Sequence, residues 1–142
     1  MVGIIVTGHA NFATGITSAL HLISGAVENY VAVDFLEGDS TQDLEQKLKA
    51  AIKSLKHCDG ILMLCDLVGG SPFKTSVRLS VDQPIQVIGG ANLPMLVEVA
   101  MTVQNVQEIN LNDLCDLALD IGQMGMQKFQ LKDTSDEDMD QL

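Results

Sequence analysis

The sequence predicts an α/β fold, in which a doubly wound, mainly parallel sheet of four strands carries helices on both faces. Short continuous apolar runs alternate along the chain with longer segments whose apolar residues recur every three or four positions. Such runs are typical of strands buried on both faces, and their alternation with helices is typical of parallel β-α units. Aromatic residues make up only 4% of the chain and Trp is absent, so we expect an aliphatic core.

The first half of the chain contains two β-α units. Residues 2–8 (VGIIVTG) form the first apolar run, and apolar residues at helical spacing follow it until residues 24–25 (SG) interrupt the pattern. Residues 30–36 (YVAVDFL) are the second predicted strand. A helix is predicted after Ser40, because an acid stands at the third helical position and leucine and isoleucine residues then line one face.

The second half continues the same alternation. Residues 60–67 (GILMLCDL) and 84–90 (PIQVIGG) are the third and fourth predicted strands. Between them, Ser71 and Pro72 predict a helix start, with Ser71 as the N-cap and Pro72 as the first helical residue. A helix with Pro94 in its first turn follows the fourth strand.

The C-terminal part is predicted to hold one more helix, a strand and a tail. Asn112 can cap a helix whose apolar residues again recur at helical spacing. Residues 128–132 (KFQLK) are a candidate for a short final strand. We therefore place one α/β domain at residues 1–132 and an acidic disordered tail at residues 133–142.

The net charge limits the classes of partner. It is −11, from 19 acidic and 8 basic side chains. Nucleic acids and anionic membranes bind clustered Lys and Arg, so no nucleic-acid partner is expected. No apolar run reaches the ~18 residues that span a bilayer and no signal peptide is recognisable, so we expect a cytoplasmic protein. Three cysteines without CxxC spacing fit reduced thiols.

Candidate functional residues stand where the predicted strands end. His9 follows the first strand and Asp66 closes the third. Gly69, Gly70 and Ser71 then form a glycine-rich turn that opens a helix. In doubly wound sheets, ligands bind outside the carboxyl ends of the strands. We therefore expect these side chains to meet at one edge of the sheet.

This combination suits the acceptance of a phosphoryl group. Asp66 can accept a proton from one nitrogen of His9 and leave the other nitrogen free as a nucleophile. The backbone at Gly69 and Gly70, the Ser71 hydroxyl and the positive end of the following helix can hold an anion. No GxxxxGKS/T loop is present, which argues against a kinase that uses ATP. No cofactor and no metal are predicted.

The same residues also allow less specific interpretations. A histidine after a strand is often only solvated or a cap, paired glycines are often only turns, and Asp66 can merely cap. His21 and His57 are interpreted as structural, and Asp34 is expected to have a capping or turn role. A flavodoxin-like module that binds FMN or another phosphate ligand without catalysis shares the fold and remains an alternative.

Three motifs carry a resemblance to a known family: GHANFATG (8–15), DLVGGSPF (66–73) and GANLPML (90–96). In this order and spacing they resemble the IIA component of the mannose family of the bacterial phosphoenolpyruvate-dependent sugar phosphotransferase system. The similarity extends over about residues 1–130. The resemblance implies a phosphotransferase component that accepts a phosphoryl group from the phosphocarrier protein HPr and passes it to a IIB component, which phosphorylates sugar imported through membrane IIC and IID partners.

The resemblance also implies roles for individual residues. His9 corresponds to the histidine phosphorylated at Nε2, Asp66 to the aspartate that hydrogen-bonds the imidazole, and Ser71 to the serine beside it. It further implies a homodimer that exchanges a C-terminal strand, for which residues 128–132 are the candidate. The chain departs from the family at Ala10, where members often have glycine. Because the sequence ends in an acidic tail, we expect the IIB component to be a separate polypeptide.

The sequence indicates the chemistry of the site more clearly than the sugar or the pathway that the phosphoryl transfer serves. The motifs look closest to the N-acetylgalactosamine and galactosamine branch of the family. Related IIA-like domains also serve dihydroxyacetone phosphorylation or occur within transcriptional regulators, and these remain alternatives. The lack of an attached kinase-partner or DNA-binding domain in the sequence favours transport.

Overall fold

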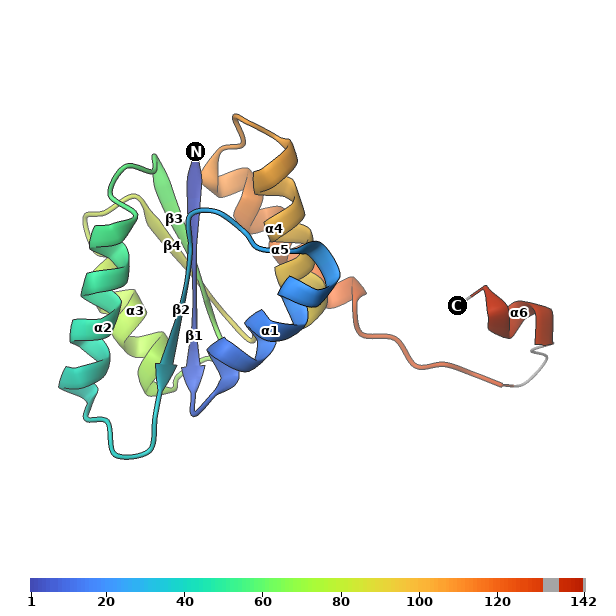
Figure 1. Ribbon diagram of the computed structural model, residues 1–142, viewed down its shortest axis with the longest axis horizontal. Helices are drawn as coiled ribbons and strands as arrows, with labels where there is room; N and C mark the ends of the chain where they lie inside the picture. Colours follow the sequence, from blue (N-terminus) through green and yellow to red (C-terminus); the bar gives the residue numbers. More distant parts are fainter. Residues whose placement is uncertain (132–135, 142) are drawn as a thin grey trace.

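The computed structural model describes residues 1–131 and 136–141, and its centre is a four-stranded parallel sheet (Figure 1). The strands are β1 (Val2–His9), β2 (Tyr30–Phe35), β3 (Gly60–Cys65) and β4 (Ile85–Gly89). They pair in parallel in the order β2-β1-β3-β4, which confirms the predicted fold class. The direction of winding changes between β1 and β3, so their carboxyl ends form the switch point where such sheets bind ligands.

Helices cover both faces of this sheet (Figure 1). On one face lie α1 (Phe12–Ser24), α4 (Leu93–Asn105) and α5 (Leu111–Met124), and on the other lie α2 (Thr41–Ser54) and α3 (Ser71–Ser80). Successive side chains of a strand point to opposite faces, so strands covered on both sides must be apolar throughout. In the described part of the chain, no helix is both long enough and apolar enough to cross a bilayer.

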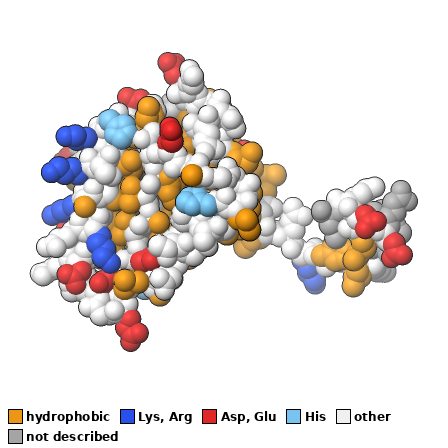
Figure 2. Space-filling view, viewed as in Figure 1, with side chains coloured by type: hydrophobic (Ala, Val, Ile, Leu, Met, Phe, Trp, Pro, Cys, Tyr) orange, Lys and Arg blue, Asp and Glu red, His pale blue; other side chains and the backbone are white. Residues whose placement is uncertain are grey.

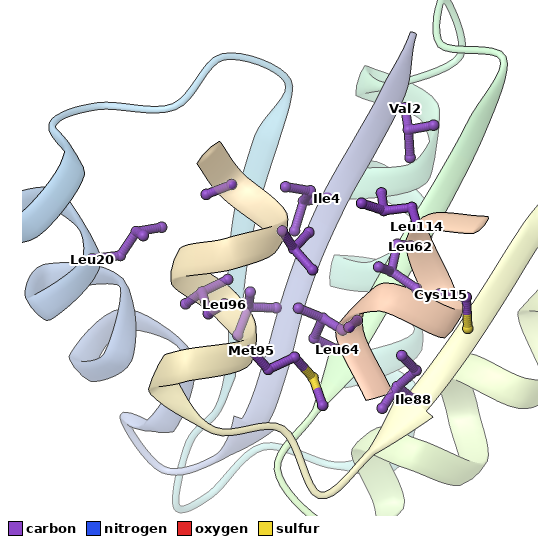
Figure 3. Close-up of a cluster of buried hydrophobic side chains, with 14 of the residues drawn as sticks. Val2, Ile4, Leu20, Leu62, Leu64, Ile88, Met95, Leu96, Leu114 and Cys115 are labelled. Carbon is purple, nitrogen blue, oxygen red and sulfur yellow. The ribbon is translucent and has the colours of Figure 1, made fainter. Parts of the chain in front are cut away.

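The larger core lies between the sheet and helices α1, α4 and α5 (Figure 3). Ile4 and Leu62 from the strands pack there with Leu96 and Leu114 from the helices, and all four are almost completely buried. Ile5 belongs instead to the second core, under α2 and α3. Burial of each such side chain stabilises the fold by about 1.5–3 kcal/mol. These two layers hold the strand ends, and therefore the site, in fixed positions.

The structure corrects two predicted helix starts. Ser71 is the first residue of α3 rather than its N-cap, because Gly70 is extended and is the last residue outside the helix. Pro72 still lies in the first turn, where the missing N–H would have had no helical partner. The cap of α5 is Asn110 rather than Asn112, because the Asn110 side chain accepts the N–H of the third helical residue.

The segment after α5 leaves the body of the molecule (Figure 1). Residues 128–131 form no strand within this single chain, and Lys132 of the predicted strand 128–132 lies outside the described residues. Within the predicted disordered tail, the structure has a five-residue helix, α6 (Asp136–Asp140). Residues 133–135 and 142 of that tail lie outside the described residues. The domain limits and the strand exchange remain predictions.

Charge is distributed unevenly over the two helical layers. Figure 2 shows the blue Lys and Arg side chains gathered on the side of the body where α2 lies. Between residues 1 and 127, all basic residues belong to α2, to the turn directly after it or to α3: Lys47, Lys49, Lys53, Lys56, Lys74 and Arg78. The layer of α1, α4 and α5 therefore carries acids without balancing Lys or Arg.

Candidate active site

His9 lies where β1 reaches the surface. Residues 2–8 of the strand are buried, whereas the His9 side chain is 47% exposed. The neighbouring strand β3 ends at Cys65, and Asp66 follows it at the same edge of the sheet. The Asp66 side chain is only 11% exposed. The pairing of β1 with β3 therefore brings an accessible imidazole against a largely buried carboxylate.

The Asp66 carboxylate fixes the orientation of His9. Its Oδ2 accepts the backbone N–H of His9 at 2.9 Å and lies 2.7 Å from the imidazole Nδ1. Its Oδ1 accepts the backbone N–H of Leu67 at 2.9 Å. Because an ionised carboxylate only accepts hydrogen bonds, the proton of a neutral imidazole is assigned to Nδ1. Nε2 then carries the lone pair that a nucleophile needs.

Two glycines allow this close packing. A Cβ atom on Gly8 would lie 2.9 Å from both Cβ and Cγ of Asp66. A Cβ atom on Gly70 would lie 2.7 Å from Cε1 and 3.4 Å from Nε2 of His9. Real Cβ atoms essentially never approach other heavy atoms within 3.0 Å, so a larger residue at either position would displace the site. The Nε2 edge of the imidazole therefore faces the turn that opens α3.

The start of α3 has no side-chain capping bond for its first backbone N–H groups. Gly69 has a φ of +88°, a left-handed conformation that favours glycine. Gly70 is the N-cap and has no side chain, so the first turn of α3 has no side-chain cap. Such N–H groups and the positive end of the helix attract anions. Ser71 is half-buried and lines an open groove of about 520 Å³ together with Lys74 and Arg78.

The sequence did not predict the contact between His9 and the end of β2. The ring of Phe35 meets the imidazole edge-on, with 5.9 Å between the centroids and 61° between the planes. The backbone carbonyl of Phe35 accepts the N–H of Ala10 at 2.7 Å. In the sequence Phe35 is an ordinary strand residue. Only the β1–β2 register, in which His9 stands opposite Phe35, reveals this contact.

Ala10 has an unusual backbone conformation for a residue with a side chain. Its φ is +50°, in the left-handed region. For a residue other than glycine this region costs roughly 1–2 kcal/mol. The glycine that the resemblance implies at this position would adopt the same conformation without that cost. The loop directly after His9 is therefore held in a strained state by the contacts around it.

Asp34, for which a capping or turn role is predicted, caps α1 from the end of β2. Its Oδ1 accepts the backbone N–H of Thr14 at 3.0 Å, and its Oδ2 accepts the Thr14 hydroxyl at 2.7 Å. Asn11, the N-cap by position, makes no side-chain capping bond. The capping role is confirmed, and it is a contact between distant residues rather than a local turn.

The other histidines lie elsewhere in the fold. His21 is in the last turn of α1, with its ring 6.2 Å from that of Tyr30. His57 follows α2, and its Nε2 lies 2.7 Å from Oδ1 of Asn29. Cys65, beneath the site, is fully buried, and this burial raises its pKa to about 11. Among the residues that the structure describes, no three His, Cys, Asp or Glu side chains gather in a group that could hold a metal ion.

Comparison with known proteins assigns the chain to a family. Residues 3–116, which include His9, Asp66 and Ser71, match the family EIIA-man, described as the PTS system fructose IIA component. The chain belongs to this family. The predicted resemblance to mannose-type IIA components is thereby confirmed.

Individual relatives agree with this assignment. The fructose-specific EIIA component of Bacillus subtilis is 30% identical over 132 residues, which cover 92% of this chain and 86% of that protein. The mannose-specific EIIAB component of Escherichia coli is 31% identical over 92% of this chain, but the chain spans only 40% of that protein. The crystal structure of an EIIA component from Streptococcus agalactiae has 35% identity and a TM-score of 0.82, and the similarity covers 91% of this chain and 98% of that one.

The family establishes the general activity of the chain. It is a phosphotransferase component that acts as a phosphoryl carrier in a sugar phosphotransferase system. Membership implies that it exchanges phosphoryl groups with HPr and with a IIB component. The flavodoxin-like binding module without catalysis is therefore no longer needed as an explanation of the site.

Proposed function

We propose that His9 is the residue that carries the phosphoryl group, on Nε2, between phospho-HPr and the IIB component. One observation carries this proposal: Nδ1 of His9 is engaged by Asp66, while the Nε2 edge faces the turn at Gly70. The two ring nitrogens thus have different tasks. One is held in place by a carboxylate, and the other is left for chemistry beside a helix N-terminus.

Transfer of the phosphoryl group needs no reactant besides phospho-HPr, His9 and the IIB component. The Nε2 lone pair of His9 forms a bond to phosphorus while the P–N bond to the donor imidazole of HPr breaks and returns its electron pair to that nitrogen. His9 keeps its Nδ1 proton, so its ring becomes positively charged beside the Asp66 carboxylate. Transfer from His9 to the IIB component restores the neutral imidazole. Asp66 therefore stabilises the charged form and keeps the reactive nitrogen free of a proton.

We propose that Gly69, Gly70 and Ser71 bind the oxygens of the phosphoryl group. The backbone N–H groups at the start of α3 lack a side-chain cap, and the Ser71 hydroxyl stands at the same helix end. An anion at a helix N-terminus gains about 0.3–1 kcal/mol, and up to about 2 kcal/mol in partly buried geometry. An interaction of this size orients a phosphoryl group and still allows its release, as a carrier requires.

We also propose where HPr and IIB dock and which further components they serve. The exposed side chains of Leu67 and Val68 lie directly after Asp66 and offer apolar area for HPr and IIB to dock. The IIB component would then phosphorylate sugar that enters through IIC and IID in the membrane. The N-acetylgalactosamine or galactosamine branch remains a prediction, since the relatives described above are named for fructose and mannose. Dihydroxyacetone phosphorylation and a regulatory role remain alternatives for the circuit.

We further propose that the chain forms a homodimer by exchange of its C-terminal strand. In support, β4 is an edge strand with one unpaired side, and an unpaired edge readily accepts another strand. Phe129 and Leu131, in the candidate segment, are 46% and 69% exposed in the single chain. Light scattering coupled to size exclusion is expected to give a dimer for the full chain and a monomer for a chain ending at Gly125. A monomeric full chain would contradict the exchange.

The acceptor histidine can be tested by phosphorylation with phosphoenolpyruvate, Enzyme I and HPr. Intact mass followed by peptide mapping under alkaline conditions is expected to find one acid-labile phosphoryl group on His9. The variant His9→Ala should take up none and keep its fold, because this side chain is half exposed. His57→Ala is the matched control and should be labelled as the wild type is. Labelling of His9→Ala at the wild-type level would contradict the assignment.

A further inference from the structure

Two helices begin beside His9. Helix α1 starts at Phe12, directly after the loop that follows His9, and α3 starts at Ser71, next to the glycine that faces the imidazole. Both helix N-termini carry N–H groups without helical partners and a partial positive charge, which attract anions. A phosphoryl group on His9 therefore has two helix N-termini close to it, and each of them can attract its negative charge.

Asp34 occupies the N-terminus of α1. Besides its two bonds to Thr14, at 3.0 Å to the N–H and 2.7 Å to the hydroxyl, it accepts the side-chain amide of Asn11 at 3.4 Å. A carboxylate thus binds the third N–H of the helix and places a negative charge at its positive end. Helix α3 differs, since its N-cap Gly70 has no side chain and no side-chain capping bond closes its first turn.

The same strand end also holds the loop that follows His9. The carbonyl of Phe35 accepts the N–H of Ala10 at 2.7 Å, and the Phe35 ring lies edge-on to the imidazole. Lys47 donates from Nζ to the backbone carbonyl of Asp34 at 3.2 Å, which ties the end of β2 to α2. The backbone at Asp34 and Phe35 is therefore held by hydrogen bonds that do not involve the His9 imidazole.

We infer that Asp34 is a positioning residue for the phosphoryl transfer proposed above, and the inference rests on that proposed function. Its carboxylate caps the N-terminus of α1 and places a negative charge there, so an anion on His9 is repelled from that helix end. The phosphoryl group on Nε2 is thereby directed to the N-terminus of α3, at Gly70 and Ser71. Asp34 acts through the helix and the loop and touches no reacting atom.

The test compares the wild type with Asp34→Asn and with a matched helix-cap control, Asn110→Ala. Asparagine keeps the size of Asp34 and an oxygen for the Thr14 N–H, but it removes the charge. Asn110 accepts the N–H of Asp113 at 2.8 Å at the start of α5. Helix α5 starts beside Gly60, at the amino ends of the strands, whereas His9 lies at their carboxyl ends. The control therefore loses a helix cap without affecting the site.

Each protein is phosphorylated with phosphoenolpyruvate, Enzyme I and HPr, and the backbone amide shifts of ¹⁵N-labelled samples are recorded before and after. In the wild type, the largest shift changes are expected at Gly70 and Ser71, with small changes at residues 12–14. In Asp34→Asn, the changes should extend to residues 12–14, and kcat should fall about tenfold with little change in the KM for HPr. Asn110→Ala should match the wild type in both respects.

Two results would overturn the inference. One is a folded Asp34→Asn variant with the wild-type rate and shift pattern. The other is a wild-type protein whose largest shift changes occur at residues 12–14, and this measurement decides the matter even where the variant fails to fold. If the wild type takes up no phosphoryl group on His9, the proposed function fails instead, so the two failures are distinguishable.

Discussion

The two edges of the His9 imidazole are built in opposite ways. The Nδ1 edge meets a largely buried carboxylate, Asp66, that receives hydrogen bonds from two backbone N–H groups as well as from the ring. The Nε2 edge faces a turn with two adjacent glycines, Gly69 and Gly70, where side chains are absent and the start of α3 is uncapped. One edge is closed by polar contacts and the other is kept open by small residues.

Such a difference suits a phosphoryl carrier, in which the nucleophile is held in place and the transferred group is bound weakly. Contacts on the closed edge fix the tautomer and the orientation of His9 before a partner arrives, which lowers the entropy that the encounter must lose. The open edge faces a helix start that no side chain caps, where we propose that backbone N–H groups bind the phosphoryl group. Changes at the two edges should therefore have different consequences.

The largest effect is expected from Asp66→Asn, which alters the closed edge. A carboxamide can present its NH₂ group to Nδ1, and the ring proton would then move to Nε2 and block the nucleophile. We expect the rate of transfer from HPr to fall by about 10³-fold with the fold retained. Rapid-quench measurement of phosphoryl transfer would check this, with circular dichroism as the control for folding. A variant with more than a tenth of the wild-type rate would contradict the role of Asp66.

The buried thiol of Cys65, directly before Asp66 at the end of β3, should resist alkylation. Burial raises the pKa of the Cys65 thiol to about 11, so at pH 8 its thiolate fraction is on the order of 10⁻³. We expect iodoacetamide at pH 8 to modify the half-buried Cys58 long before Cys65, and Cys65 to react only when urea unfolds the protein. The fraction of Cys65 thiolate rises as the pH approaches 11. Peptide mapping after timed alkylation measures both rates, and equal rates in the folded protein would argue against a rigid β3 end.

A smaller effect is expected from Gly70→Ala, which fills the open edge. The new Cβ would lie 2.7 Å from Cε1 of His9, so the imidazole or the turn must shift. Gly70 has a φ of −75°, so alanine brings no backbone strain and the effect is steric. We expect transfer to slow by about tenfold. The control is Gly15→Ala on α1, where a Cβ meets nothing within 4 Å, and this variant should transfer at the wild-type rate. Equal rates in the two variants would contradict the contact.

The smallest effect is expected from Ala10→Gly, in the loop between β1 and α1. Glycine relieves the left-handed strain at a φ of +50° but adds chain entropy to the unfolded state. We expect a net gain of about 0.5–1 kcal/mol in the free energy of unfolding. Urea denaturation measures this difference. A loss of stability would mean that the Ala10 methyl makes contacts that outweigh its strain.

Much of the fold follows from the sequence, because each strand is an apolar run bounded by a turn and each helix shows apolar residues at helical spacing. The position of His9 and Asp66 at one edge also follows, since both residues end strands that a parallel sheet aligns. The helix caps were harder to assign. Asn110 and Asn112 are both suitable caps two residues apart, and only the extended backbone at Asn110 distinguishes them.

The contacts of β2 with the His9 loop could not be predicted. Asp34 and Phe35 stand more than twenty residues from His9, and their contacts depend on the order of the strands and on the register of β1 with β2. Apolar periodicity predicts that a strand exists, but it does not predict which strand lies beside it. The left-handed conformation of Ala10 was hidden for the same reason, because it is imposed by these distant contacts.

We propose that Nδ1 of His9 holds the proton that Asp66 accepts, while Nε2 carries the phosphoryl group. The most direct measurement is a long-range ¹H–¹⁵N correlation spectrum of the His9 ring before and after phosphorylation by HPr, combined with ³¹P–¹⁵N coupling. We expect a proton on Nδ1 in the free protein and coupling of phosphorus to Nε2 in the phosphorylated one. Phosphorus coupled to Nδ1, or a free protein with its ring proton on Nε2, would contradict it.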